Sequence, residues 1–312
     1  MRILFGLTVR HTSGMLHIVN FISKSASQHM STTTDNLHHI DTLIGTRLAA
    51  HASHIAEEAL NSTAVAIPRH VVAKVVLAIA QLGTTTHPRV WHAAAALELI
   101  RAGSAMHRRL INSTSSAIVH GPTLMLGDYF YALAANEMAE SPHTDIIADY
   151  STCVMRVAEA FLTRIPLSDP SVLAHATAHI DAVEGAMMQC AVRAGSICGQ
   201  HQLFADGVVL GNALGRYVAA ALHIHEAQTD PLHSLARGII ILPLAYALQQ
   251  DYTATHALIQ RDDAYALSSY LESVGAIRAT QQFQATAAQS ITATYTAAGI
   301  PQAAALIHEL LA

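Results

Sequence analysis

The sequence predicts an all-α, single-domain protein, and three observations lead to this fold class. Hydrophobic residues make up 52% of the 312 residues, in long segments rich in Ala, Leu, Val and Ile. These segments show little of the apolar–polar alternation that is typical of half-buried strands. No Gly/Ser-rich linker and no internal repeat divides the chain, so we expect one domain over residues 35–312.

The helices can be placed in chain order from the apolar segments and the residues that interrupt them. Helices are predicted over Val71–Leu82, Ala94–Leu110, Leu124–Met138, Ile147–Leu162 and His175–Cys198. Prolines fall between the helical segments, where helices should end, at Pro68, Pro88, Pro122, Pro142, Pro166, Pro170 and Pro231. Pro243 is the exception, because it lies inside the apolar run Gly238–Leu248, which we expect to be a buried and kinked helix.

Residues 1–34 differ in character from the rest of the chain. The first 30 residues contain Arg2, Arg10 and Lys24, several serines and no acidic residue. Such a composition is typical of a transit peptide, and equally of an upstream extension read from a start codon before Met30. We expect this leader to be disordered. The protein should be cytoplasmic, or imported into an organelle if the leader is a transit peptide.

Composition also narrows the classes of partner. Only 12% of residues are charged and the formal net charge is −5, which argues against a nucleic-acid partner. No uninterrupted apolar run reaches the roughly 18 residues that a membrane-spanning helix needs. Cys153, Cys190 and Cys198 form no C-x-x-C pair. We therefore expect them to be reduced and buried in the protein core, and the protein to be in a reducing compartment. The apolar surplus favours further burial in an oligomer.

The 21 histidines are the second unusual feature of the composition. Helical metal-ligand spacing occurs at His175 and His179, and at His51 and His54, but neither pair has a nearby cysteine or third histidine. We therefore expect no metal site. Protonation of all the histidines would reverse the sign of the net charge, so we expect steep changes in behaviour between about pH 5 and 7.5.

The segment Glu98–Asn112 carries the main functional signal. Its sequence, ELIRAGSAMHRRLIN, places the adjacent Arg108 and Arg109 on an otherwise apolar predicted helix. Arginines in this setting can extend along the surface and keep their charged ends in water. The residues around this pair favour a functional interpretation.

This segment resembles the first aspartate-rich motif of the polyprenyl synthetases, the family of trans-prenyl diphosphate synthases. The family pattern is E-x-I-H-x-x-S-x-x-H-D-D-x-x-D, whose aspartates hold magnesium against a substrate diphosphate. Four of its positions are kept, at Glu98, Ile100, Ser104 and His107. The three aspartates are replaced by Arg108, Arg109 and Asn112.

Three more segments carry the resemblance, which covers roughly residues 42–312. Gly127-Asp128-Tyr129 is similar to the family's G-D-Y, and Arg237–Leu248 to its G-K-x-T-L-P-x-x-x-A-L. Counted from Gly215, the second aspartate motif falls where this chain has Leu222, His223 and Glu226. The resemblance implies an isoprenoid-synthase-type helical bundle around a central cavity, and dimers.

The cationic positions of the family are replaced as well. The lysine of its K-T-A segment aligns with Glu184, and the lysine and threonine of its G-K-x-T segment align with Ile239 and Ile241. The upstream G-G-K-R-L-R-P falls near Pro68 and Arg69, where at most one arginine remains. Every segment that handles diphosphate in the family is altered, whereas the packing positions between them are kept.

These replacements should remove the magnesium chemistry. Magnesium prefers near-octahedral oxygen ligands, whereas arginine offers only donors and stays protonated. One carboxylate and two imidazoles across the cavity make a poor magnesium site. Because metal ions neutralise the leaving diphosphate, ordinary chain elongation should be lost, and we expect neither a cofactor nor a catalytic residue.

Two functions remain open. The first is a non-catalytic partner or regulatory subunit of an isoprenoid diphosphate synthase, or a binder of a prenyl ligand. The second is a diverged isoprenoid-processing enzyme, transferase-like or terpene-cyclase-like. In that enzyme Arg108 and Arg109 would hold an anionic head group, and His223, His225 or Glu226 would move protons.

A ligand that would suit these positions is apolar with an anionic head, which Arg108 and Arg109 would bind with help from Arg69. By the resemblance, the small Gly103 and Ser104 stand at tunnel positions, so nothing closes the tunnel at that level. The alternative is that the helices fill this slot, or that the arginines pair with Glu98, Glu184 or Glu226.

For assembly we expect a homodimer, or a heterodimer with an intact prenyl diphosphate synthase. By resemblance only, the interface is placed at Gly127–Tyr129 and the following helix, Phe130–Met138.

Overall fold

A computed structural model describes residues 37–46, 70–83, 86–110, 117–204, 207–236, 238–301, 303, 304 and 307, including all side chains except those of 108–110 and 117–123. Predictions about the leader, residues 1–34, therefore lie outside the described residues. Within the described ranges the regular secondary structure is helical and no strand occurs, which confirms the predicted all-α class.

Among the described residues, the first helix covers residues 37–46. The others are α4 (Val71–Ala80), α5 (Val90–Leu110), α6 (Ala117–Ala139), α7 (Thr144–Leu162), α8 (Val172–Ile180), the π-helical turn η1 (Asp181–Gly185), α9 (Ala186–Cys198), α10 (Val208–Thr229), α11 (Pro231–Leu235), α12 (Leu242–Gln250), α13 (Tyr252–Gln260), α14 (Ala264–Ser273) and α15 (Ala276–Ala297). The five helices predicted from the sequence correspond to these elements, although the first ends at Ala80 rather than Leu82, and His175–Cys198 spans α8, η1 and α9.

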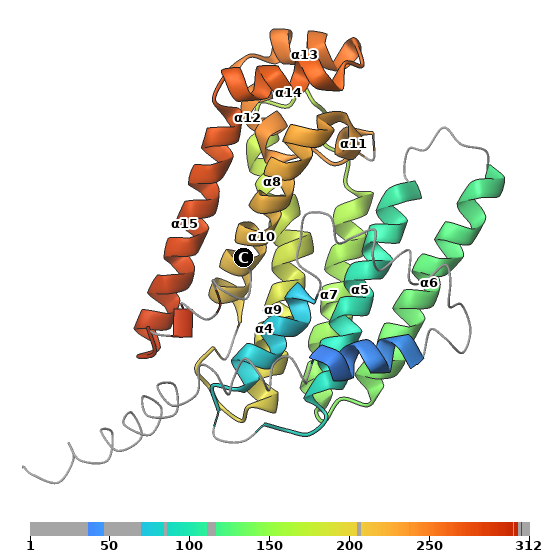
Figure 1. The fold of residues 1–312 in the computed structure, drawn as a ribbon, viewed down its shortest axis with the longest axis vertical. Helices are drawn as coiled ribbons and strands as arrows, with labels where there is room; N and C mark the ends of the chain where they lie inside the picture. Colours follow the sequence, from blue (N-terminus) through green and yellow to red (C-terminus); the bar gives the residue numbers. More distant parts are fainter. Residues whose placement is uncertain are drawn as a thin grey trace, which may run out of the picture.

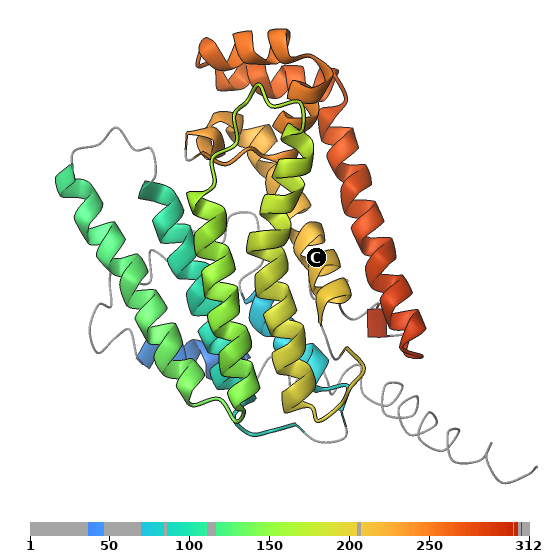
Figure 2. The ribbon, with the colours of Figure 1, turned by 180° about the vertical axis from the view of Figure 1, so that it is seen from behind.

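The long helices run side by side along the long axis of the molecule (Figure 1). Helices α5 and α6 pack against each other at one edge, and α10 packs against α15 at the other. Seen from behind, α7 and the α8–α9 run lie next to each other between these edges (Figure 2). Helices α13 and α14 lie across one end of the bundle.

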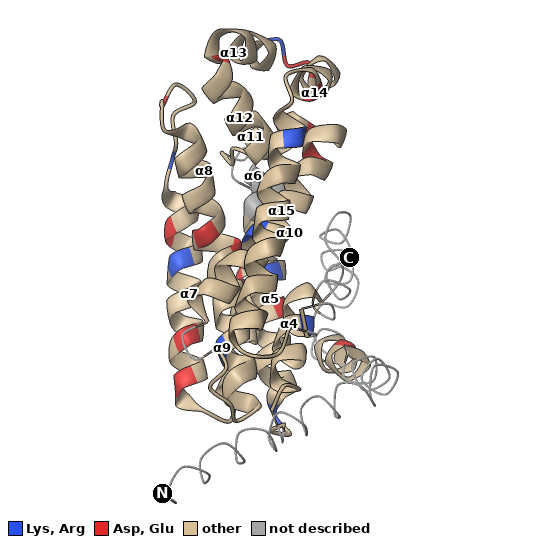
Figure 3. Ribbon diagram, turned by 90° about the vertical axis from the view of Figure 1, so that its left-hand side faces the viewer, with Lys and Arg blue, Asp and Glu red and all other residues tan. Residues whose placement is uncertain are grey.

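The core is divided into two clusters along the bundle. The larger joins α4, α5, α6, α7 and α9 to the first half of α10, and the smaller joins α8 and α12 to the second half of α10 and the start of α15. Small residues let the helices approach closely: a Cβ on Gly195 of α9 would lie 2.7 Å from the Ile79 side chain of α4. Charged ribbon positions are few and widely spaced (Figure 3).

Two prolines do not act as the sequence analysis expects. Pro122 lies inside α6, so the prediction that it separates two helices is wrong. Pro243 stands in the first turn of α12, so it kinks no helix. The first-turn amides of a helix have no intrahelical acceptor, and proline therefore costs no hydrogen bond there. The run Gly238–Leu248 is helical only from Leu242.

The predicted helix His175–Cys198 is interrupted once. Its middle forms η1, a π-helical turn over Asp181–Gly185, between α8 and α9. Sequence periodicity does not reveal such a turn, because it adds one residue without ending the helix.

Among the described residues, no helix is both long enough and apolar enough to cross a lipid bilayer.

Candidate functional site

The segment Glu98–Leu110 forms the second half of α5, and Glu98 stabilises a neighbouring helix. The Glu98 carboxylate accepts hydrogen bonds from the backbone N–H groups of Val72 (2.8 Å) and Ala73 (3.0 Å) at the start of α4. It also accepts from Arg101 Nε at 2.8 Å. Burial by itself would raise the pKa of Glu98, but Arg101 and the Ala73 amide outweigh it and bring the pKa below its ordinary value of 4.5.

The two predicted tunnel positions lie directly against α6. Ser104 is fully buried, and its hydroxyl is 2.9 Å from the Tyr131 hydroxyl. A Cβ on Gly103 would lie 3.1 Å from the Gly127 carbonyl and 3.3 Å from Phe130 Cβ. At this level, therefore, Phe130 and Tyr131 of α6 occupy the space next to both small residues.

His107 ends this row of α5 contacts. Its ring lies edge-on to Tyr131 and against the backbone of Gly127. Its Nε2 is 3.3 Å from Asp128 Oδ1, within ion-pair range, yet this nitrogen has no aligned hydrogen bond. Partial burial lowers the pKa of His107 below its ordinary value of 6.5, and the Asp128 carboxylate offsets this only in part.

The positions that the resemblance aligns with the first aspartates are only partly described. Arg108 and Arg109 lie in the last turn of α5, and their side chains are outside the described residues. Asn112 and Arg69, the other predicted members of the anion site, also lie outside the described residues. Of the acids suggested as arginine partners, Glu98 is paired with Arg101, and Glu226 accepts a hydrogen bond from Ser234.

The positions of the second motif lie on the second half of α10. His223 is buried, and its Nδ1 accepts a hydrogen bond from the Leu242 amide, 3.2 Å away at the start of α12. In the neutral ring the proton must therefore be on Nε2. Leu222 packs on the larger core cluster, and the Glu226 carboxylate is 2.5 Å from Ser234 Oγ on α11.

The residues aligned with the family's cationic segments are buried in the bundle. Glu184, in η1, is 9% exposed, and a Cβ on Gly215 of α10 would lie 2.7 Å from the Glu184 carbonyl carbon. Ile239 and Ile241, in the segment that precedes α12 in the chain, are both buried. These positions offer packing contacts and one carboxylate.

The remaining candidate ligands and nucleophiles lie apart from these motifs. His175 Nδ1 is 3.5 Å from Asp169, and His179 packs on Phe161. His51 and His54 lie outside the described residues. Across the described part of the chain, no three His, Cys, Asp or Glu side chains converge as a metal site would require.

The three cysteines are buried, as predicted. Burial raises the pKa of Cys153 and Cys198 to about 12 and that of Cys190 well above its ordinary value, so these thiols stay protonated and unreactive.

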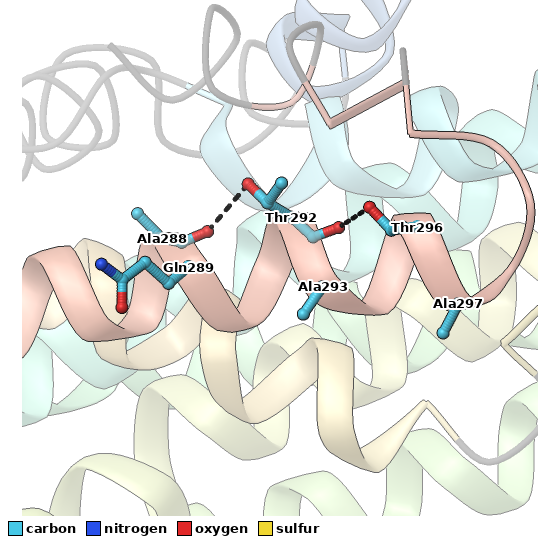
Figure 4. A pocket seen from close by; sticks show the side chains of 6 residues that line it. All are labelled: Ala288, Gln289, Thr292, Ala293, Thr296 and Ala297. Carbon is cyan, nitrogen blue, oxygen red and sulfur yellow. Dashed lines mark hydrogen bonds between the residues drawn. The ribbon is translucent and has the colours of Figure 1, made fainter.

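Sequence reasoning missed one hollow, which lies away from both motifs. It has a volume of about 630 Å³ and follows the outer face of α15 (Figure 4). It is lined by Ala288, Gln289, Thr292, Ala293, Thr296 and Ala297. The signal in the sequence was the stretch 279–307, which contains no Lys, Arg, Asp or Glu.

Comparison with known proteins supports the fold at low sequence identity. No protein-family model matches the chain, and no curated protein does. Solved structures match over nearly its whole length. A geranylgeranyl pyrophosphate synthase from Lactobacillus brevis has a TM-score of 0.72 at 14% identity, covering 90% of this chain and 98% of its own.

Two further structures agree. A polyprenyl synthase from Caulobacter crescentus, complexed with calcium and isoprenyl diphosphate, has a TM-score of 0.67 at 16% identity, covering 89% of this chain and 95% of its own. Heptaprenyl diphosphate synthase from Staphylococcus aureus has a TM-score of 0.69 at 14% identity, covering 89% and 97%. The protein therefore has the all-α isoprenoid synthase fold. Within that class its fold is polyprenyl-synthetase-like, as the sequence motifs predicted.

Proposed function

We propose that this protein is a non-catalytic polyprenyl-synthetase-like protein that serves as a partner or regulatory subunit of an isoprenoid diphosphate synthase. The observation that carries the proposal is the replacement of the aspartates at the positions aligned with both motifs, where Glu226 is the one carboxylate that remains. Arg108 and Arg109 cannot ligate magnesium, and they would repel it.

The geometry of α10 supports the same conclusion. The Leu222 side chain has no atom that can ligate a metal ion. The Nδ1 of His223 accepts a hydrogen bond from the Leu242 amide, and the Glu226 carboxylate accepts one from Ser234. One engaged carboxylate and one imidazole nitrogen do not fit a magnesium–diphosphate site, which needs several free oxygen ligands.

An activity assay tests the first half of the proposal. The purified protein is incubated with magnesium and with allylic and homoallylic diphosphates, alone and together with an intact synthase from the same cell. We expect no elongated product from this protein alone. Magnesium-dependent product from clean protein would overturn the proposal.

The mixture tests the partner role. We expect the two proteins to elute together in size-exclusion chromatography, and the synthase to change its rate or its product length. Absence of a complex, together with unchanged synthase kinetics, would leave no basis for a subunit role.

A metal-independent ligand is the second part of the proposal. Two adjacent arginines at the end of α5 can hold an anionic head group by charge-assisted hydrogen bonds. The test is titration with a prenyl diphosphate in excess chelator, comparing Arg108→Ala/Arg109→Ala with Arg89→Ala/Arg278→Ala. The control pair removes the same charge from exposed positions elsewhere. Binding that is lost only in the first variant supports the ligand, and no binding by the unmodified protein contradicts it.

A further inference from the structure

The π-helical turn η1 is held from two sides by arginines. A π turn contains one residue more than α geometry requires, and it is rare because its hydrogen bonds run from i to i+5. Such a turn persists where neighbouring groups make contacts that the α-helical form would lose. The first residue of η1, Asp181, makes those contacts here.

Two helices contribute to the contacts of Asp181. From α10, Arg216 donates to both carboxylate oxygens, with Nε 2.8 Å from Oδ1 and Nη2 2.7 Å from Oδ2. From α7, Arg156 donates to the Asp181 backbone carbonyl at 3.1 Å. The side chain and the carbonyl of one residue are therefore fixed by different helices.

The same arginine from α7 extends the network to α9 and α10. Arg156 Nη1 donates to Gln189 Oε1 at 2.8 Å, and Gln189 Nε2 donates to Asn212 Oδ1 at 2.6 Å. The network joins α7, α9 and α10 around the turn. The hydrogen bond to Asp181 raises the pKa of Arg216 above its ordinary value.

The far end of the turn has no room to adjust. A Cβ on Gly215 would lie 2.5 Å from the Gly185 nitrogen, and one on Gly185 would lie 2.7 Å from Asn212 Oδ1. The backbones of η1 and α10 are therefore in direct contact. Buried Glu184 lies between the fixed Asp181 and this contact, so the π turn decides where residue 184 stands relative to α10.

We propose that Asp181, Arg216 and Arg156 form a lock that keeps η1 in its π-helical register and thereby positions Glu184 against α10. Without the lock, relaxation to α geometry would rotate one flanking helix by about 100°, the angle that one residue occupies. The lock is a conformational device of the fold, and it operates whether or not the protein is catalytic.

Hydrogen exchange of the purified full-length chain tests this lock. Exchange is measured by mass spectrometry for peptides that cover residues 178–188, in the unmodified protein and in Arg216→Gln and Asp181→Asn. The matched control is Arg193→Gln, because Arg193 pairs with Asp149, an acid of α7 that lies outside the turn. The Arg216 side chain is 40% exposed, so solvent screens its ion pair with Asp181.

We expect both lock variants to exchange about tenfold faster within 178–188 and at unchanged rates elsewhere, because local opening becomes easier. The control should leave this segment at its original rate. Equal exchange in Arg216→Gln and the unmodified protein would overturn the lock, as would faster exchange spread evenly over all helices.

Arg216→Lys keeps the test decisive if Arg216→Gln does not fold. Lysine keeps the charge but lacks the two-pronged geometry that grips both carboxylate oxygens. The expected exchange rate within 178–188 is therefore intermediate, and a rate equal to that of the unmodified protein would contradict the lock.

Discussion

Glu98, which the resemblance aligns with an acid of the first motif, has a structural role. Its carboxylate is 2% exposed and receives hydrogen bonds from two backbone amides of α4 and from Arg101. The residue before α4, His70, provides no side-chain cap, so Glu98 supplies from another helix the acceptor that a cap residue would normally provide.

Replacing Glu98 by Gln should destabilise the protein by about 2–4 kcal/mol. The change leaves Arg101 buried without a compensating charge and weakens the bonds to α4. Urea unfolding followed by circular dichroism gives the free energy of unfolding. The control Glu140→Gln removes an exposed carboxylate 3.8 Å from Arg89 and should change this energy by less than about 0.5 kcal/mol. Equal effects of the two changes would contradict the capping role.

His107 should make stability depend on pH. Its pKa is lower in the folded protein than the ordinary 6.5, so the unfolded chain binds the proton more readily. Stability is therefore fully present above about pH 6.5 and is lost as the pH falls through the folded pKa. Between pH 6.5 and about pH 5, we expect the melting temperature of His107→Gln, measured by calorimetry, to fall less than that of the unmodified protein. An unchanged slope would show that other histidines govern this range.

At the scale of the element, the contact between η1 and α10 depends on glycines. Gly215 of α10 leaves no space for a side chain, because a Cβ would lie 2.5 Å from the Gly185 nitrogen. The obstacle is backbone, which cannot move away as the end of a side chain can. The two helices can therefore cross at this point only without side chains.

Gly215→Ala should lower the free energy of unfolding by several kcal/mol, because the helices must separate or strain. Gly45→Ala is the matched control: Gly45 lies in the helix over residues 37–46, and nothing is within 4 Å of its added Cβ. The control should be neutral or stabilising by up to about 1 kcal/mol. Thermal melts of both variants decide this, and similar losses in the two would contradict the tight crossing.

At the scale of the whole molecule, the outer faces of α6 and α7 suggest how the protein assembles. Exposed large apolar side chains occur there at Met125 (66%) and Leu124 on α6, and at Met155 (58%) and Leu162 on α7. Phe130 and Met138, which the sequence analysis placed at the interface, are buried in the protein's own core. The proposed dimer surface is therefore the opposite face of α6, together with α7.

Light scattering at micromolar concentration should show a dimer, either of this chain or with the intact synthase. Met125→Glu/Met155→Glu should raise the dissociation constant of the dimer at least tenfold, because two charges would be buried against apolar surface. Val209→Glu/Tyr265→Glu places the same charges at exposed residues of α10 and α14 and should have no effect. A dimer unchanged by the first pair would place the interface elsewhere.

Features that depend on local sequence were predictable. The apolar periodicity indicated the helices from Val71 to Cys198, and the kept residues around Arg108 and Arg109 indicated the fold although the identity to solved structures is 14–16%. Burial of the cysteines followed from their residue type and surroundings. In each case the signal lies within a few turns of one helix, where neighbouring residues determine the outcome.

Only the tertiary structure decided which distant residues meet. Asp181 pairs with Arg216, and Glu98 with the start of α4, across 35 and 26 positions of the sequence, respectively. The π turn also depends on such contacts, because surrounding helices can stabilise a backbone that local propensity disfavours. The sequence by itself determined the fold class. The positions of Glu184 and His223 in the bundle arise from packing, since a side chain's surroundings are set by residues that are remote in the chain.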